Sequence, residues 1–199
     1  MHDYPSDIAF TPAVKAIQSR KGSRDTFAGM ERDRGWQTRV TPGLTSFLAR
    51  LDMFYLGTAN AECQPYIQYR GGPPGFLKVI DDHTLGFADF GGNKQFITIG
   101  NLSENPKAFI FLMDYAEVQR IKIWGTATVI EDAPELFDRL SDPAYPGKVE
   151  RAILFIVEAW DVNCPQHIHR RFSQQQVAAV VEKLQERVRE LEDEVATLK

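Results

Sequence analysis

Closely spaced runs of alternating apolar and polar residues fill the middle of the chain, and they constrain its fold more than any other feature. The first run covers residues 53–58 and the last covers residues 151–162, and turn residues such as Gly, Pro, Asn and Asp separate the runs between them. Short runs with a period of two are typical of β-strands. At least six strands with few helices between them predict a mainly β fold with flanking helices, arranged as an antiparallel barrel.

Composition and charge narrow the class of protein. The chain has 199 residues, of which 43% are hydrophobic and 25% charged, as expected for one globular domain with an appendage. The net charge is −4 and no basic stripe with interleaved aromatic residues occurs, which argues against a nucleic-acid partner. The apolar runs are too short to span a membrane, and residues 1–5 do not resemble a signal peptide. We therefore expect a cytoplasmic protein with no membrane partner.

The cysteines and histidines predict neither a disulfide framework nor a metal site. Cys63 and Cys164 are few and far apart in the sequence. His167 and His169 have the spacing of two ligands on one side of an extended segment, but no third ligand lies near them in the sequence.

Two helix starts precede the predicted strands. Thr11-Pro12 and Thr41-Pro42 each combine a capping threonine with a proline that suits the first helical position. We expect residues 1–40 to form an N-terminal helical extension, and residues 42–51 to form an amphipathic helix that leads into the barrel.

A glycine pair breaks the strand pattern between residues 89 and 107. Gly91-Gly92 is followed by Asn93, Lys94 and Gln95, which we expect to begin a short helical turn that Gly100-Asn101 ends. Backbone N–H groups at such a helix start, together with a lysine in its first turn, suit an anion. The segment is equally compatible with a simple connection that carries a surface lysine.

The strand at residues 63–70 carries polar side chains on one face. Alternation places Tyr66, Gln68 and Arg70 together, opposite Ile67 and Tyr69. Such a face is usually solvated, but the glycine- and proline-rich run at residues 71–75 would allow the backbone to approach another group closely. In the long strand at residues 119–130, a single glycine at position 125 predicts a bulge or another close approach.

The C-terminal residues 173–199 predict one long helix with a heptad repeat. Three valines recur every seven residues, and so do three leucines. Labelling these valines a and these leucines d gives the pattern of a parallel two-stranded coiled coil. This helix is expected to be a dimerisation element, with packing on its own barrel as the alternative. The heptad positions are Val181, Leu184, Val188, Leu191, Val195 and Leu198.

Several of these motifs, in this order, resemble the pyridoxamine 5′-phosphate oxidase-like flavoproteins. The matching segments are residues 65–76, 89–94, 100–102, 105–106, 120–130 and 163–168. The resemblance covers roughly residues 40–172. It implies that residues 41–172 form a six-stranded antiparallel split β-barrel, and that two copies make a homodimer with FMN bound at two sites between the subunits.

The resemblance also implies a set of cofactor-binding residues. Lys94 matches the lysine that binds the FMN phosphate, and Arg120 belongs to a Gln-Arg pair that stands where the family has Arg-Gln. The segment at residues 163–169 resembles the part that closes over the isoalloxazine ring. The expected FMN-binding residues are Gln68, Tyr69, Arg70, Asp89, Asn93, Lys94, Gln95, Asn101, Arg120 and His167.

The chain departs from true pyridoxamine-phosphate oxidases because it lacks their tryptophan- and arginine-rich C-terminal segment. We therefore do not expect pyridoxamine phosphate as its substrate. The resemblance implies an FMN-dependent oxidoreductase that transfers hydride or electrons between NADH or NADPH and an unidentified small molecule, with no side-chain acid or base required. Two alternatives remain open: a non-catalytic flavin-binding or sensing module, and a relative that uses a deazaflavin or haem in the same barrel.

Overall fold

The computed structural model describes residues 3–198, which divide into two compact units. One unit contains residues 3–113 and 120–164, and the other contains residues 114–119 and 165–198. The N-terminal extension thus belongs to the same unit as the barrel strands.

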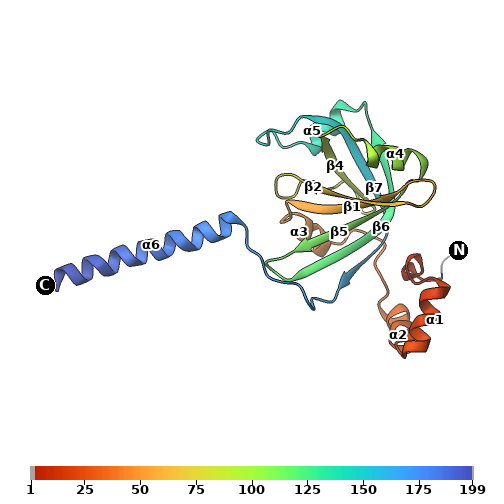
Figure 1. Cartoon of the computed structure of the whole chain (residues 1–199), viewed down its shortest axis with the longest axis horizontal. Coiled ribbons are helices and arrows are strands. Elements are labelled where there is room, and N and C mark those ends of the chain that lie inside the picture. The colour runs from red at the N-terminus through yellow and green to blue at the C-terminus, as the bar shows by residue number, and fades with distance from the viewer. Residues whose placement is uncertain (1–2, 199) are drawn as a thin grey trace. The chain divides into compact units, whose positions relative to one another are not determined.

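One antiparallel sheet forms the larger unit, in the order β2-β1-β5-β6-β7-β4-β3 (Figure 1). The sheet curls around a core, which confirms the predicted antiparallel split barrel. The seventh strand, beyond the six expected, is the two-residue β3. The strands are β1 Met53–Ala59, β2 Pro65–Gly71, β3 Lys78–Val79, β4 Thr84–Phe90, β5 Lys107–Asp114, β6 Gln119–Ile130 and β7 Val149–Asn163.

Alternation along the strands fills the barrel. Leu56, Ile110, Ile123 and Phe155 come from four different strands and are completely buried in one cluster. Helix α3, Pro42–Leu48, packs its apolar side chains into the same cluster. Removing this apolar surface from water is the main driving force for the fold.

The predicted helix starts are confirmed by their caps. The Thr11 hydroxyl accepts a hydrogen bond from the Val14 amide at 3.3 Å, and the Thr41 hydroxyl accepts one from the Leu44 amide at the same distance. Helix α3 ends earlier than the predicted residue 51. The other helices are η1 Pro5–Ile8, α1 Pro12–Lys21, α2 Arg24–Asp33, α4 Ile97–Glu104, α5 Pro134–Leu140 and α6 Gln174–Thr197. Of the helices that the structure describes, none combines the length and apolar character needed to cross a bilayer.

The end of the N-terminal extension is attached to the outside of the barrel. Gln37 and Trp160 exchange two backbone hydrogen bonds, at 3.1 and 2.8 Å. The Trp36 ring stacks on the Trp124 ring with 4.7 Å between their centroids. Strand β7 therefore has a partner beyond the barrel strands themselves.

Gly125 confirms the predicted bulge and the predicted close approach together. The register between β6 and β7 shifts between Trp124 and Gly125. A Cβ atom at Gly125 would lie 1.9 Å from the Ile156 carbonyl oxygen, so only glycine fits there.

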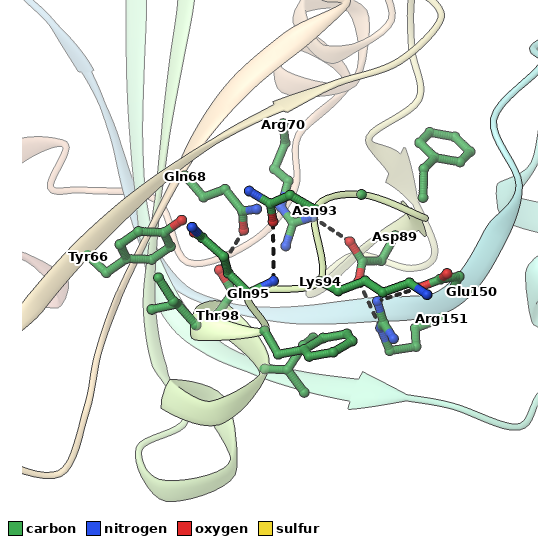
Figure 2. A pocket seen from close by; sticks show the side chains of 15 residues that line it. Tyr66, Gln68, Arg70, Asp89, Asn93, Lys94, Gln95, Thr98, Glu150 and Arg151 are labelled. Atoms are coloured by element: carbon green, nitrogen blue, oxygen red, sulfur yellow. Dashed lines mark hydrogen bonds and ion pairs between the residues drawn. The ribbon is translucent and has the colours of Figure 1, made fainter.

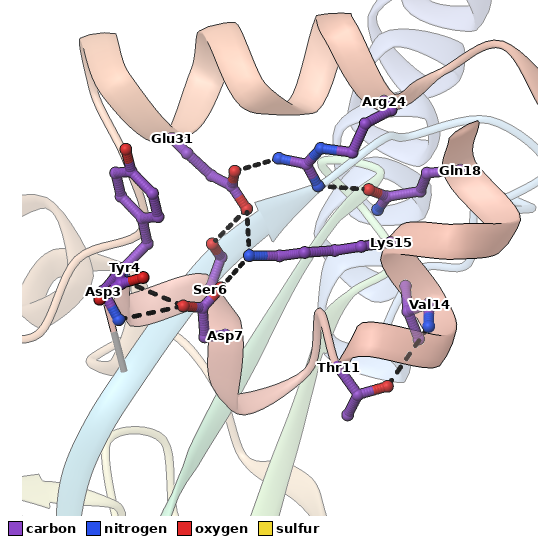
Figure 3. Close-up of polar contacts among 10 residues, drawn as sticks. All are labelled: Asp3, Tyr4, Ser6, Asp7, Thr11, Val14, Lys15, Gln18, Arg24 and Glu31. Atoms are coloured by element: carbon purple, nitrogen blue, oxygen red, sulfur yellow. Dashed lines mark hydrogen bonds and ion pairs between the residues drawn. The ribbon is translucent and has the colours of Figure 1, made fainter. Parts of the chain in front are cut away.

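An ion cluster around the buried Glu31 carboxylate ties the N-terminal helices together (Figure 3). The Glu31 side chain is 2% exposed, pairs with Arg24, and accepts a hydrogen bond from the Ser6 hydroxyl at 3.1 Å. The Lys15 ammonium lies 2.6 Å from an Asp7 carboxylate oxygen and 3.9 Å from Glu31. The hydrogen bond from Lys15 outweighs burial, and it lowers the pKa of Asp7 below its usual value.

Replacing Lys15 with Met should lower the free energy of unfolding in a pH-dependent way. Because the folded-state pKa of Asp7 lies below its unfolded value of about 3.9, the Lys15–Asp7 stabilisation is present above about pH 4 and is lost as the pH falls through the folded-state pKa. Urea unfolding at neutral and at acidic pH measures the difference. Lys21→Met, at the exposed end of the same helix, is the matched control and should change little. A Lys15→Met effect that is equally large in acid would contradict this assignment.

Candidate functional site

The helical turn predicted after β4 differs from the observed helix α4 at both ends. Helix α4 begins at Ile97, not at Asn93, and it continues through Gly100 and Asn101 to Glu104. The helix starts late because Lys94 and Phe96 have left-handed backbone conformations that a right-handed helix does not contain. The helix ends at Glu104 because Pro106 follows Asn105, and the residue before a proline is sterically kept out of the helical backbone region. The backbone of Asn105 is extended, as this rule requires.

Two residues of the loop between β4 and α4 adopt the left-handed backbone region without being glycine. Lys94 has φ 60° and Phe96 has φ 54°. Such conformations cost of order 1–3 kcal/mol each and cluster at functional sites. Phe96 occupies the N-cap position of α4 and its side chain has no acceptor, so it cannot bond the first amides of the helix. The first amides of α4 therefore receive no hydrogen bond from an N-cap side chain.

Strand β2 supplies the opposite wall. Its burial pattern confirms the predicted alternation: Tyr66, Gln68 and Arg70 are half-buried, whereas Ile67 and Tyr69 are exposed. The Thr98 hydroxyl of α4 donates a hydrogen bond of 2.6 Å to the Gln68 side-chain oxygen. This bond joins the helix start to the strand.

Between these walls lies a cavity of about 280 Å³ (Figure 2). It brings together six of the ten predicted cofactor-binding residues, from β2, β4 and the loop that follows β4. Its lining includes Gln68, Arg70, Asp89, Asn93, Lys94 and Gln95, together with Tyr66, Phe90, Gly92, Phe96, Ile97, Thr98, Ile99, Glu150 and Arg151.

Asp89 is the centre of the charge network in the cavity. Its side chain is 4% exposed, and its two oxygens pair with two guanidinium groups, Arg70 on one side and Arg151 on the other. The Arg151 Nε lies 2.9 Å from Asp89, and another Arg151 nitrogen lies 3.0 Å from Glu150. Burial alone would lower the pKa of Arg151, but hydrogen bonding to Asp89 and the negative charges of Asp89 and Glu150 raise it, so the guanidinium stays charged.

The charges of the cavity lining do not cancel. Three cations, Arg70, Lys94 and Arg151, face two carboxylates, Asp89 and Glu150. Both carboxylates are already paired with arginine. Within residues 3–198, no ion pair involves Lys94, so its ammonium is the surplus positive charge of the cavity.

One guanidinium nitrogen also lacks a partner. The Arg70 Nε is buried and forms no hydrogen bond to any described residue. A buried N–H group without an acceptor costs about 1–3 kcal/mol, and native structures rarely leave one unpaired. An acceptor oxygen from a ligand would remove this cost.

The other four predicted residues are not in the described lining of the cavity. Tyr69 points to the opposite face of β2 and is 61% exposed. Asn101 is buried in α4, where its amide donates a 3.0 Å hydrogen bond to the Thr58 hydroxyl. Arg120 pairs with the end of β7 at the start of β6, and His167 is exposed in the smaller unit.

Arg151, Glu150 and Thr98 line the cavity but were not predicted from the sequence. Arg151 stands opposite Asp89 in the register of β4 and β7, although 62 residues separate them in the chain. Only this strand pairing brings the two together. Over the described part of the chain, no group of three or more His, Cys, Asp or Glu side chains is placed to hold a metal ion.

Replacing Asp89 with Asn should destabilise the protein by about 3 kcal/mol, because it leaves two largely buried guanidinium groups without their shared carboxylate. Asp82→Asn is the matched control. Asp82 pairs with Arg39, but both side chains are more than half exposed, so its loss should cost less than about 1 kcal/mol. Urea unfolding measures both. Equal losses in the two variants would show that the Asp89 network contributes no more than a surface ion pair.

A solved structure shares this fold. A structure of HupZ from Group A Streptococcus matches 66% of this chain and 98% of its own, with a TM-score of 0.51 and 17% sequence identity. An FMN-binding protein from Syntrophomonas wolfei matches 75% of this chain and 97% of its own, with a TM-score of 0.49 and 18% identity. No curated protein matched the chain. The model of the family described as pyridoxamine 5′-phosphate oxidase matches residues 40–163, which is more than half of the chain. This chain therefore belongs to the pyridoxamine 5′-phosphate oxidase family.

Proposed function

We propose that this protein is an FMN-binding flavoprotein and that the cavity beside Lys94 holds the FMN phosphate. The observation that carries the proposal is that one cavity contains two unsatisfied groups. One is the surplus cation Lys94, and the other is the buried Arg70 Nε–H group, for which no described residue provides an acceptor. A phosphate monoester brings nearly two negative charges and three acceptor oxygens. It would satisfy both groups at once, through charge-assisted hydrogen bonds.

The backbone around Lys94 supports the same ligand. The amides of the loop and of the first turn of α4 would bond the remaining phosphate oxygens, and the positive end of the helix dipole favours the charge. The carboxylates of Asp89 and Glu150 would not repel the phosphate strongly, because arginine already neutralises both.

The cavity size implies that the ring system lies outside it. A volume of about 280 Å³ is at the lower limit for a small-molecule site of roughly 300–1,000 Å³. It suits the phosphate and part of the ribityl chain. The rim carries Phe96 and Ile97, which are 50% and 40% exposed and offer apolar surface next to the opening. We propose that a second copy of the chain completes the ring site, so that the protein functions as a homodimer.

Bound FMN would supply hydride or electron transfer, and we propose that the protein is an oxidoreductase acting between NADH or NADPH and a small molecule. The residues of this chain bind and orient the cofactor. Lys94 and Arg70 would hold the phosphate, while the Thr98–Gln68 hydrogen bond fixes the wall along which the ribityl chain would run.

Titration of the purified protein with FMN, a deazaflavin and haem tests the choice of cofactor. The proposal predicts a visible flavin band and a thermal shift with FMN. Preferential binding of the deazaflavin or haem would assign the barrel to that cofactor, and no shift with FMN would refute the proposal. Stopped-flow mixing of the FMN complex with NADH and NADPH then tests the enzyme. Bleaching of the flavin band supports an oxidoreductase, and no reduction by either donor supports a binding or sensing module.

Replacing Lys94 with Ala should weaken FMN binding about 10- to 100-fold, because a hydrogen bond to a charged group contributes about 1.5–3 kcal/mol. Quenching of flavin fluorescence measures the Kd. Riboflavin, which lacks the phosphate, should bind the variant and the parent protein equally well. Lys107→Ala, an exposed lysine at the start of β5, is the matched control. If the affinities for FMN and riboflavin fall together, Lys94 does not hold the phosphate.

A further inference from the structure

Helix α6, Gln174–Thr197, carries an apolar stripe that the rest of its own unit leaves uncovered. The helix starts in a capping box, in which the Ser173 hydroxyl accepts from the Gln176 amide at 3.1 Å and the Gln176 side chain accepts from the Ser173 amide at 2.8 Å. The helix runs without interruption (Figure 1). None of its residues is buried. A water-exposed helix with an apolar stripe normally buries that stripe against a partner.

The stripe has a strict seven-residue repeat. Three valines recur at one position and three leucines at another, and each of the six side chains is at least 42% exposed. A period of seven differs from the 3.6-residue spacing by which a helix packs on a globular surface, and it imposes a left-handed supercoil. The a positions are Val181, Val188 and Val195, and the d positions are Leu184, Leu191 and Leu198.

We propose that α6 pairs with α6 of a second copy of this chain in a parallel, in-register, two-stranded coiled coil. β-Branched residues at a with leucine at d favour two parallel strands over other oligomers. The stripe is self-complementary, because each valine layer meets the same valine of the second copy and each leucine layer meets the same leucine.

The charges beside the stripe agree with a parallel pair. Arg187 occupies a g position and would meet Glu192, at e, on the second copy. Within the single helix Arg187 contacts Glu190 at 2.8 Å, but both side chains are about 60% exposed. Such an exposed pair contributes little, so Arg187 can exchange it for the interhelical contact.

The coiled coil is short, and its stability rests in part on the homodimer of the proposed function. About three heptads are marginal when isolated in water. Joining two copies through the barrels raises the effective concentration of one helix near the other. The coiled coil is therefore a second association between copies, separate from the flavin site.

Site-directed cross-linking of the full chain tests the arrangement. Cys63 and Cys164 are first replaced with Ser, and a single cysteine is then introduced by Val181→Cys, at an a position near the start of the stripe. A parallel pair places the two introduced thiols face to face, within reach of a disulfide. An antiparallel pair would separate them by about 25 Å, because a helix rises about 1.5 Å per residue.

Mild oxidation should shift the Val181→Cys chain on a non-reducing gel from its mass of 22.6 kDa to twice that mass. Glu186→Cys, at an outward f position of the same helix, is the matched control and should stay at the single mass. Adding Leu184→Ser and Leu191→Ser to Val181→Cys should abolish the shift. The flavin band and circular dichroism of the same samples report whether cofactor and fold are intact.

Two results would overturn the proposal. One is cross-linking of Val181→Cys no greater than that of Glu186→Cys in a folded protein. The other is a disulfide between Val181→Cys and Leu198→Cys in a mixture of the two variants, which would show an antiparallel pair. If either result occurs while FMN remains bound, only the coiled coil fails. If FMN binding is absent but Val181→Cys cross-links, only the proposed function fails.

Discussion

The buried carboxylate of Asp89 is the interaction on which the site depends. It holds Arg70 from β2 and Arg151 from β7 at the end of β4, so three strands that are distant in the sequence meet at one charge. A buried ion pair of this kind adds little net stability, because removing the charges from water costs about as much free energy as their attraction provides. Its main effect here is on geometry, because it fixes the orientation of the Arg70 and Arg151 guanidinium groups beside the cavity. It leaves one of them, Arg70, with an N–H group that still needs an acceptor.

The loop after β4 complements this charge network. Strained left-handed residues at positions 94 and 96 interrupt the chain between strand and helix, and the strain delays the start of α4 until Ile97. Lys94, which forms no ion pair with any described residue, therefore lines the same small cavity as the two arginines. Strands place the two arginines, and a short strained loop places the lysine, so the cations of the cavity come from different kinds of element.

Glycine plays structural parts in this chain that are easily mistaken for ligand contacts. The run at residues 71–75 suggested a close approach to another group. In the structure the run approaches another part of the same chain. A Cβ at Gly75 would lie 3.2 Å from the Ala49 carbonyl oxygen, and the Gly75 amide donates a 2.9 Å hydrogen bond to the Leu51 carbonyl oxygen. The run thus packs against the turn that follows α3. The polar face of β2 instead lines the cavity, through Tyr66, Gln68 and Arg70.

The sequence by itself determined the local features of this protein. Alternation specified the strands and the inward faces, threonine–proline pairs specified two helix starts, and Gly125 marked the bulge, because each depends on residues close together in the chain. The motif order was enough to indicate the family, and six of the ten residues that it predicted to bind the cofactor line one cavity in the structure. Tertiary structure alone decided the partners: Arg151 reaches Asp89 through strand register, and Asn101 bonds Thr58 across 43 residues. Strand pairing joins residues that are far apart in the sequence, and a local sequence pattern does not reveal such partners. The charge balance of the cavity therefore follows only from the folded sheet.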